Sequence, residues 1–207
     1  MLRFFSLCFF LLCSVVLSAQ KPFEGRIRFK IQYVYLPDDM KGLESVLPQT
    51  CELITNGKDW RLTQSTEIDG DLVMIYLHKS DTVFSQLKVG AEKLRLAKTH
   101  PETDQNVRIV ETEKTKEIAG VEVKQCFVKS FEGAAQEIWI QPHFLNLKRA
   151  FQSNSKLLPL EFETEVGGVK LKYTAALVSQ EPIDETYFVL SSEFKPVSAA
   201  VYDRWLR

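Results

Sequence analysis

Hydrophobic and polar residues alternate along several stretches of the chain, most clearly in residues 23–35, FEGRIRFKIQYVY. The polar positions between the apolar ones are occupied mainly by charged residues. Successive residues of a strand point to opposite faces of a sheet, so this pattern predicts a long strand with one buried and one solvated face. Such strands are typical of antiparallel sheets. The apolar positions are Phe23, Ile27, Phe29, Ile31, Tyr33 and Tyr35.

Shorter runs of the same kind, separated by turn residues, predict the rest of a sheet. Asn56-Gly57 is the strongest hairpin signal among the turns. One run, 93–98, fits a strand or a helix. The predicted strands cover 50–55, 59–65, 72–78, 82–89, 93–98, 107–113, 121–131, 136–141, 157–165 and 169–179.

Short helices are predicted at three places: from Asp38 or Asp39 to Leu47, at 144–151 and at 199–207. Strands and helices do not alternate as they do in parallel sheets. We therefore expect a mainly β (α+β) fold, with about ten strands in one strongly curved antiparallel sheet. This sheet would form an incomplete barrel wrapped around two or three short helices. No repeat or linker divides residues 20–207, so we expect a single domain.

The first nineteen residues differ from the rest of the chain. Arg3 is their only charge, and Phe4–Leu17 is an apolar run shorter than a membrane span. We interpret 1–19 as a signal peptide cleaved before Gln20, with an uncleaved anchor as the alternative. Leu12 before Cys13 does not fit an acylation site. The protein is thus expected to be exported to the periplasm or the cell exterior, and not integral to the membrane after cleavage.

Composition narrows the classes of partner. The 207 residues carry a net charge of −1, and 45% are hydrophobic. The sequence has no excess of basic residues of the kind that would indicate nucleic acid binding. Cys51 and Cys126 are the two cysteines beyond the signal peptide. Export permits a disulfide between them, and two buried free thiols are the alternative. No Cys-x-x-Cys pattern supports a catalytic cysteine.

The chain lacks the patterns that catalysis usually requires. Its three histidines are widely separated, which does not fit the close spacing of zinc ligands. There is no Gly-x-Ser-x-Gly motif for a serine nucleophile. Glu161, Glu163 and Glu165 alternate with Leu160 and Phe162, so we expect these carboxylates to face water. We predict no catalytic residue, no metal site and no cofactor, and we do not expect an enzyme.

Three groups of residues together resemble a known family. They are Phe23-Glu24-Gly25; 115–120 with Glu137-Ile138-Trp139-Ile140; and 183–188 with Phe194-Lys195-Pro196-Val197. Their order resembles an uncharacterised family of secreted proteins of Gram-negative bacteria, a domain of unknown function. That family looks related to the periplasmic lipoprotein carriers of the Lol type (LolA/LolB-like). The resemblance implies a half-barrel with an apolar cavity and brings no catalytic residue. Val123 stands where the family often has a cysteine.

The aromatic residues supply the candidate binding site. Several of them can line one apolar interior, where they would bind a lipid or another apolar ligand. Ordinary core packing is the alternative. In that case the protein would instead be an envelope interaction module that binds another protein through its surface or a sheet edge. A hydrolase with a dispersed site is a weaker alternative. The candidate lining residues are Phe29, Tyr33, Trp60, Phe84, Phe127, Trp139, Phe162 and Tyr173.

Overall fold

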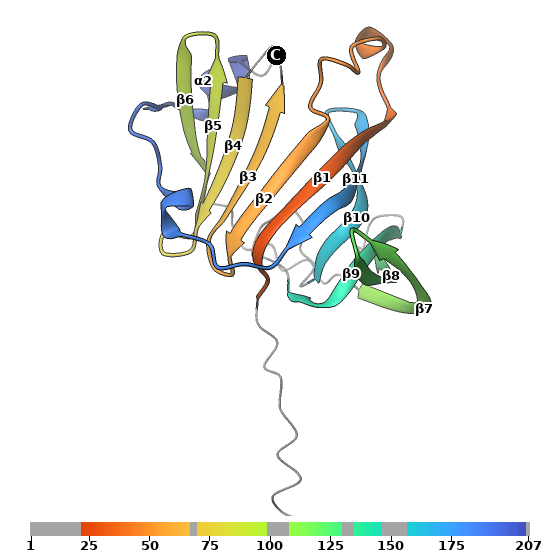
Figure 1. Ribbon diagram of the computed structural model, residues 1–207. Helices are drawn as coiled ribbons and strands as arrows, with labels where there is room; N and C mark the ends of the chain where they lie inside the picture. The colour runs from red at the N-terminus through yellow and green to blue at the C-terminus, as the bar shows by residue number, and fades with distance from the viewer. Residues whose placement is uncertain (1–21, 67–69, 99–107, 130–134, 146–156, 206–207) are drawn as a thin grey trace, which may run out of the picture.

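The computed structural model describes residues 22–66, 70–98, 108–129, 135–145 and 157–205. Within these residues the chain forms one twelve-stranded sheet, in the order β12-β6-β5-β4-β3-β2-β1-β11-β10-β9-β8-β7 (Figure 1). The strands are β1 (Glu24–Tyr35), β2 (Thr50–Asn56), β3 (Trp60–Thr66), β4 (Gly70–Leu77), β5 (Thr82–Val89), β6 (Glu92–Lys98), β7 (Arg108–Ile118), β8 (Val121–Lys129), β9 (Gln136–Leu145), β10 (Leu157–Val166), β11 (Val169–Ser179) and β12 (Lys195–Pro196).

Short connections order most of the sheet, because strands joined by tight turns pair with each other. At the Asn56-Gly57 turn, the Asn56 Oδ1 atom accepts hydrogen bonds from the backbone N–H groups of Lys58 and Asp59. Two pairings join strands that are distant in sequence: β1 with β11, which is antiparallel, and β12 with β6, which is parallel. The mainly β, mostly antiparallel prediction is confirmed.

Strand β1 lies in the middle of the sheet, and its alternation defines two faces. We call the face with Ile27, Phe29 and Ile31 the inner face, and the face with Arg26 and Arg28 the outer face. The inner-face residues of β1 are buried and belong to the main core cluster of 21 residues. The pattern of residues 23–35 therefore did predict which side of this strand is buried.

The chain after β11 covers part of the outer face. We call residues 180–197 the C-terminal strap; it includes the 3-10 turn η3 (Glu185–Phe188). Ile183 and Phe188 of the strap pack on Ile54, Val73 and Ile75 of β2 and β4. Beyond β12, helix α2 (Ala199–Trp205) packs its Tyr202 against leucines of β5 and β6. In Figure 1 the strap crosses the lower ends of the central strands and then follows the β6 edge.

The three predicted helices have different outcomes. The helix over 38–47 is wrong, because the segment contains only the 3-10 turn η1 (Asp38–Met40). Phe144, the start of the second predicted helix, lies in strand β9, and residues 93–98, which fitted a strand or a helix, form strand β6. The C-terminal helix is confirmed, over Ala199–Trp205. The described sheet is open, and it is not strongly curved around helices, because the described residues form essentially no helices for it to enclose.

Two sequence interpretations fall outside the described residues. The signal peptide, 1–19, is one of them, and residues 146–151 of the second predicted helix are the other. Within the described part of the chain, no helix is long and apolar enough to cross a membrane.

Candidate functional site

Five of the eight aromatic candidates lie on the inner face. Phe29, Phe162 and Tyr173 form one cluster in which ring centroids are 5.0 to 6.3 Å apart. All three are buried. Trp60 is buried as well and stacks on Tyr76, with centroids 5.9 Å apart. Tyr33 is partly buried, packs against the same core and donates a hydrogen bond to the carbonyl oxygen of Pro48. These five aromatic side chains therefore occupy the interior on the inner face.

The other three aromatic candidates are only half-buried. Phe84 pairs with Ile75, and Trp139 pairs with Glu161, both in rows of the outer face. Phe127 pairs with Val110 of β7. Trp139 also packs against the main core, so six of the eight predicted lining residues lie in or against that core, and the structure does not gather all eight into one group.

Both cysteines are free thiols in the main core. Burial raises the pKa of Cys51 to about 12. It also raises the pKa of Cys126 above its ordinary value. Because the thiolate is the reactive form, neither side chain is prepared for nucleophilic chemistry at neutral pH. Among the described residues, no group of three or more His, Cys, Asp or Glu side chains is placed to hold a metal ion.

The strap leaves part of the outer face open. Cross-strand pairing produces a row with Arg28, Glu52 and Thr63, and it pairs Lys30 with Thr50. Ser65 of β3 lines the same pocket as Thr50. Leu177 of β11 continues the first row beside Arg28. We call these seven residues the outer-face patch. Five of them, Arg28, Thr50, Glu52, Thr63 and Ser65, line a pocket of about 240 Å³.

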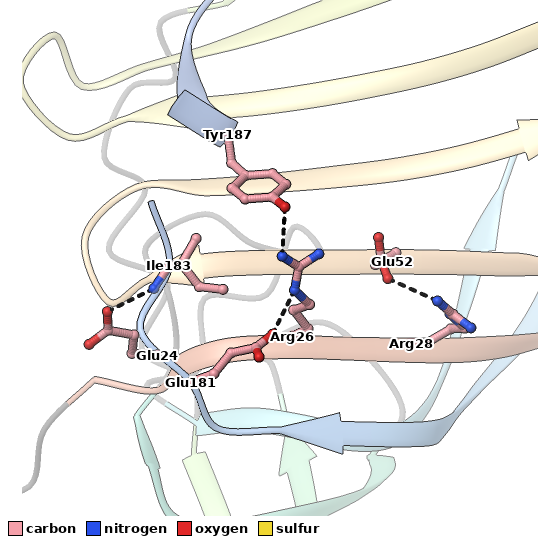
Figure 2. Close-up of polar contacts among 7 residues, drawn as sticks. All are labelled: Glu24, Arg26, Arg28, Glu52, Glu181, Ile183 and Tyr187. Atoms are coloured by element: carbon pink, nitrogen blue, oxygen red, sulfur yellow. Dashed lines mark hydrogen bonds and ion pairs between the residues drawn. The ribbon is translucent and has the colours of Figure 1, made fainter. Parts of the chain in front are cut away.

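Arg26, one position along the same face, is held by the strap (Figure 2). Its Nε atom donates to Glu181 at 2.7 Å, and its Nη2 atom donates to the Tyr187 hydroxyl at 2.8 Å. Its guanidinium also lies over the Tyr187 ring, 4.7 Å from the centroid. The backbone N–H of Ile183 donates to the Glu24 carboxylate nearby. These contacts hold the strap against Arg26, which does not line the pocket.

Among the described residues, Arg28 has no comparable set of partners. Its Nη2 atom donates one hydrogen bond of 3.3 Å to Glu52 (Figure 2), and its side chain is 56% exposed. A guanidinium has five N–H donors, so most of its donor capacity faces solvent. The Thr50, Thr63 and Ser65 hydroxyls add further donors and acceptors. This arrangement can bind a carboxylate together with neutral polar groups.

The alternation did predict a charged face carrying Arg26 and Arg28, but not which of the two would remain available. That difference depends on Glu181 and Tyr187, about 155 residues further along the chain. Leu177 was part of a predicted strand, and nothing in its local sequence indicated that it would remain 46% exposed beside Arg28.

A second polar cluster lies across β7, β10 and β11. Glu161 contacts Lys116 at 2.9 Å and Lys172 at 3.1 Å, and its side chain is only 13% exposed. Lys116 also lies over the Trp139 ring, 4.0 Å from the centroid. Burial raises the pKa of Glu161, but the hydrogen bonds from the two lysines outweigh burial and lower it below its ordinary value. The expectation that Glu161 faces water is wrong. Because Lys116 and Lys172 both form ion pairs with Glu161, we interpret the cluster as structural.

Comparison with known proteins gives a likeness of fold. Two structures of PNGF-II, in space groups C2 and P21, match this chain with TM-scores of 0.53 and 0.54 at 15% sequence identity. Each alignment covers 87% of this chain and 32% of PNGF-II, so the chain spans about a third of that protein's length. No family model matches the chain, and no curated protein does. At this level of identity the likeness shows that the chain shares its fold with part of PNGF-II.

Proposed function

We propose that this chain is an exported protein-interaction module that binds an acidic, partly apolar segment of a partner protein on the outer-face patch. The observation that carries this proposal is the state of Arg28. It stands on the central strand β1, makes one long hydrogen bond to Glu52, and directs a largely exposed guanidinium to the surface. An arginine in this setting can form a paired, charge-assisted hydrogen bond with a carboxylate.

The neighbours of Arg28 favour a protein segment over a small anion. Leu177 offers an exposed apolar side chain, and Thr63 and Ser65 offer hydroxyl groups. Interfaces between proteins combine apolar contacts, arginine and neutral hydrogen-bonding groups in this way. Within the seven residues of the patch, Arg28 and Lys30 exceed the single acid, Glu52, and Asp71, which pairs with Ser65, borders the patch on its β4 side. An acidic ligand is therefore favoured at the Arg28 and Lys30 end of the patch.

Two further observations favour binding on the outer face over two other functions, which are carrying a lipid and binding a partner strand at a sheet edge. A carrier needs unfilled apolar space, whereas Phe29, Phe162 and Tyr173 are buried against one another. A sheet edge that recruits a strand is usually flat and uncharged, whereas β7 is rich in Glu and Lys. The outer face remains as the open polar surface with a pocket.

A peptide-binding experiment tests this function. A fluorescent twelve-residue peptide of Asp, Glu, Leu and Tyr is titrated with the purified protein, and anisotropy reports binding. Arg28→Glu should raise the Kd about tenfold or more, because it replaces an attractive contact with a repulsive one. Lys129→Glu, an exposed position at the end of β8, makes the same charge change away from the patch and should leave the Kd unchanged.

Two results would overturn the proposal. One is equal binding of a peptide with Lys in place of Asp and Glu, which would remove the charge argument. The other is a lipid that co-purifies in stoichiometric amount, detected by native mass spectrometry and organic extraction, together with no peptide binding. That second result would favour the carrier.

A further inference from the structure

We propose that the partner segment is carried by a second copy of this chain, whose acidic tip binds the outer-face patch. We define the acidic tip as Val34, Tyr35, Asp38, Asp39, Leu43, Glu44 and Val166. This inference rests on the proposed function, because it assumes that the patch binds an acidic and partly apolar segment. It names that segment and makes the association self-complementary.

The tip is a compact feature at one end of the sheet. Tyr35 ends β1 and pairs with Lys170 of β11. A Cβ placed on Gly168, in the turn between β10 and β11, would lie 3.8 Å from the Pro37 side chain. The loop after β1 and the β10–β11 turn are therefore neighbours, as Figure 1 shows at the upper right. The tip thus joins residues from both segments.

Apolar side chains are unusually exposed here. Four large apolar residues of the tip, Val34, Tyr35, Leu43 and Val166, have exposed fractions between 46% and 56%. Scattered exposed apolar residues are common, but a group of them on one protruding end is typical of a binding surface. The loop is also anchored at its base, because Tyr33 donates to the Pro48 carbonyl and the Ile31 N–H donates to the Gln49 carbonyl.

The charge of the tip is opposite to that of the patch. Asp38, Asp39 and Glu44 are all exposed, and Lys41 is the one basic residue between them. Lys41 lies 2.6 Å from Asp38, so it neutralises one acid and leaves two. The tip therefore offers what the patch requires: carboxylates for Arg28 and Lys30, and apolar side chains for Leu177.

In the folded chain the two aspartates of the tip lie away from the patch. Lys30 and Tyr35 belong to the same extended strand, which separates them by about 16 Å. Pro37, next to Asp38, lies beyond Tyr35 and near Gly168 of the β10–β11 turn. The loop then returns toward the patch, where the Gln49 side chain, next to Thr50, donates to the Glu44 carbonyl oxygen. Asp38 and Asp39 can therefore be brought to Arg28 and Lys30 by a second copy.

If one tip binds one patch, the bound pair keeps one free tip and one free patch, and the contact is heterologous; if each tip binds the other copy's patch, the pair closes as a two-fold dimer. Association should depend on concentration and weaken with salt, since its charges are exposed. It needs no sheet edge and no change in the fold.

Sedimentation velocity on the purified protein tests the inference, from about 1 to about 500 μM at low salt. The weight-average sedimentation coefficient should rise with concentration for the wild type. Asp38→Lys with Asp39→Lys should weaken association about tenfold or more, by placing like charges together. The matched control, Glu113→Lys with Glu117→Lys on β7, makes the same change at exposed positions outside the tip and should associate as the wild type does.

Mixing two defective variants gives the sharpest result. The Asp38→Lys, Asp39→Lys variant keeps its patch, and Arg28→Glu keeps its tip. Each alone should associate at least about tenfold more weakly than the wild type, whereas an equimolar mixture should form a 1:1 dimer that grows no further. A wild type that stays monomeric throughout, or a mixture that does not pair, would overturn the inference. If the acidic peptide still binds the patch in that case, the proposed function stands and only the identity of the partner is wrong.

Discussion

At the scale of the residue, Phe29 shows how far alternation decides burial. It is fully buried, and its ring meets Phe162 and Tyr173 edge to face. Phe29→Ala should lower the free energy of unfolding by about 3–5 kcal/mol, because it removes the buried ring and leaves a cavity. Urea denaturation monitored by circular dichroism measures this.

The same strand supplies a control for Phe29. Tyr35→Ala removes an aromatic ring that is 56% exposed, so the free energy of unfolding should change by no more than about 0.5 kcal/mol. Equal losses from the two variants would mean that the inner-face cluster contributes nothing specific to stability.

Glu161 gives stability a dependence on pH. Lys116 and Lys172 hold its pKa below the ordinary value of 4.5, despite burial. A lowered carboxyl pKa contributes stability that is fully present above the unfolded value and is lost as pH falls through the folded value. The difference in unfolding free energy between the wild type and Glu161→Gln should therefore be largest above pH 4.5 and should shrink below it.

Urea denaturation at intervals from about pH 3 to about pH 7 checks this dependence. Glu163→Gln, at an exposed position two residues away on β10, is the control for loss of a carboxylate. A difference between wild type and Glu161→Gln that stays constant over this range would show that the two lysines do not favour the ionised form.

Phe29 and Glu161 also show what the sequence could and could not predict about single residues. Alternation assigned Phe29 to the buried face, since that assignment needs only the period of a strand. It correctly assigned Glu161 to the opposite face, but the Glu161 side chain is not exposed to water on that face. Lys116 approaches from β7, 45 residues earlier in the chain, and no local pattern indicates this.

At the scale of the element, Gly25 is required by the pairing of β1 with β11. Its φ is +145°, and a Cβ on it would lie 2.0 Å from the backbone oxygen of Ser179. Gly25→Ala should therefore cost more than about 3 kcal/mol, because one strand must shift to relieve a backbone clash. Thermal denaturation followed by circular dichroism measures the change.

A variant at Gly42 separates the effect of this clash from the effect of an unfavourable backbone conformation. It also has a positive φ, +84°, but nothing lies within 4 Å of a Cβ at that position. Gly42→Ala should cost about 1 kcal/mol, from the unfavourable backbone conformation alone. If Gly25→Ala is no more destabilising than Gly42→Ala, the close approach of Ser179 is not what selects glycine there.

Gly42 further explains why a predicted element is missing. The apolar spacing of Met40, Leu43 and Leu47 favoured a helix over 38–47, but a residue at φ +84° cannot continue a right-handed helix. Only one 3-10 turn forms before it. Strands were predicted well because their two-residue period spans whole segments. Short helices of one or two turns have too few residues for the helical period to be distinctive.

At the scale of the whole molecule, the pairing of strands that are distant in sequence could not be predicted from the sequence. Tight turns place neighbouring strands side by side, but nothing local pairs β1 with β11 or brings β12 beside β6. The candidate site depends on these pairings. The row that joins Leu177 to Arg28 exists only because β11 lies next to β1, and the strap that occupies Arg26 begins where β11 ends.

The two edges of the sheet lead to a prediction about solubility. Within the described residues, β7 is paired on one side only, and its pairing with β8 is irregular between Glu111 and Thr115. The other edge, β12, has two residues, one of them Pro196. Charges, irregular pairing and proline are features that keep edges from recruiting further strands. Replacing the charges of β7 should therefore produce aggregation by edge pairing.

The variant is Glu113→Val with Lys114→Thr and Glu117→Val, and the measurement is light scattering over time, with infrared spectra for new intermolecular strands. About 0.5 M salt suppresses association between tip and patch, so edge pairing is observed alone. Glu163→Val with Lys170→Thr and Glu165→Val makes the same exchanges at exposed positions of β10 and β11, which are interior strands of the sheet. This control should remain monomeric, because the added apolar surface does not lie on an edge strand. Aggregation of both variants at one rate would assign the effect to surface hydrophobicity and not to the edge.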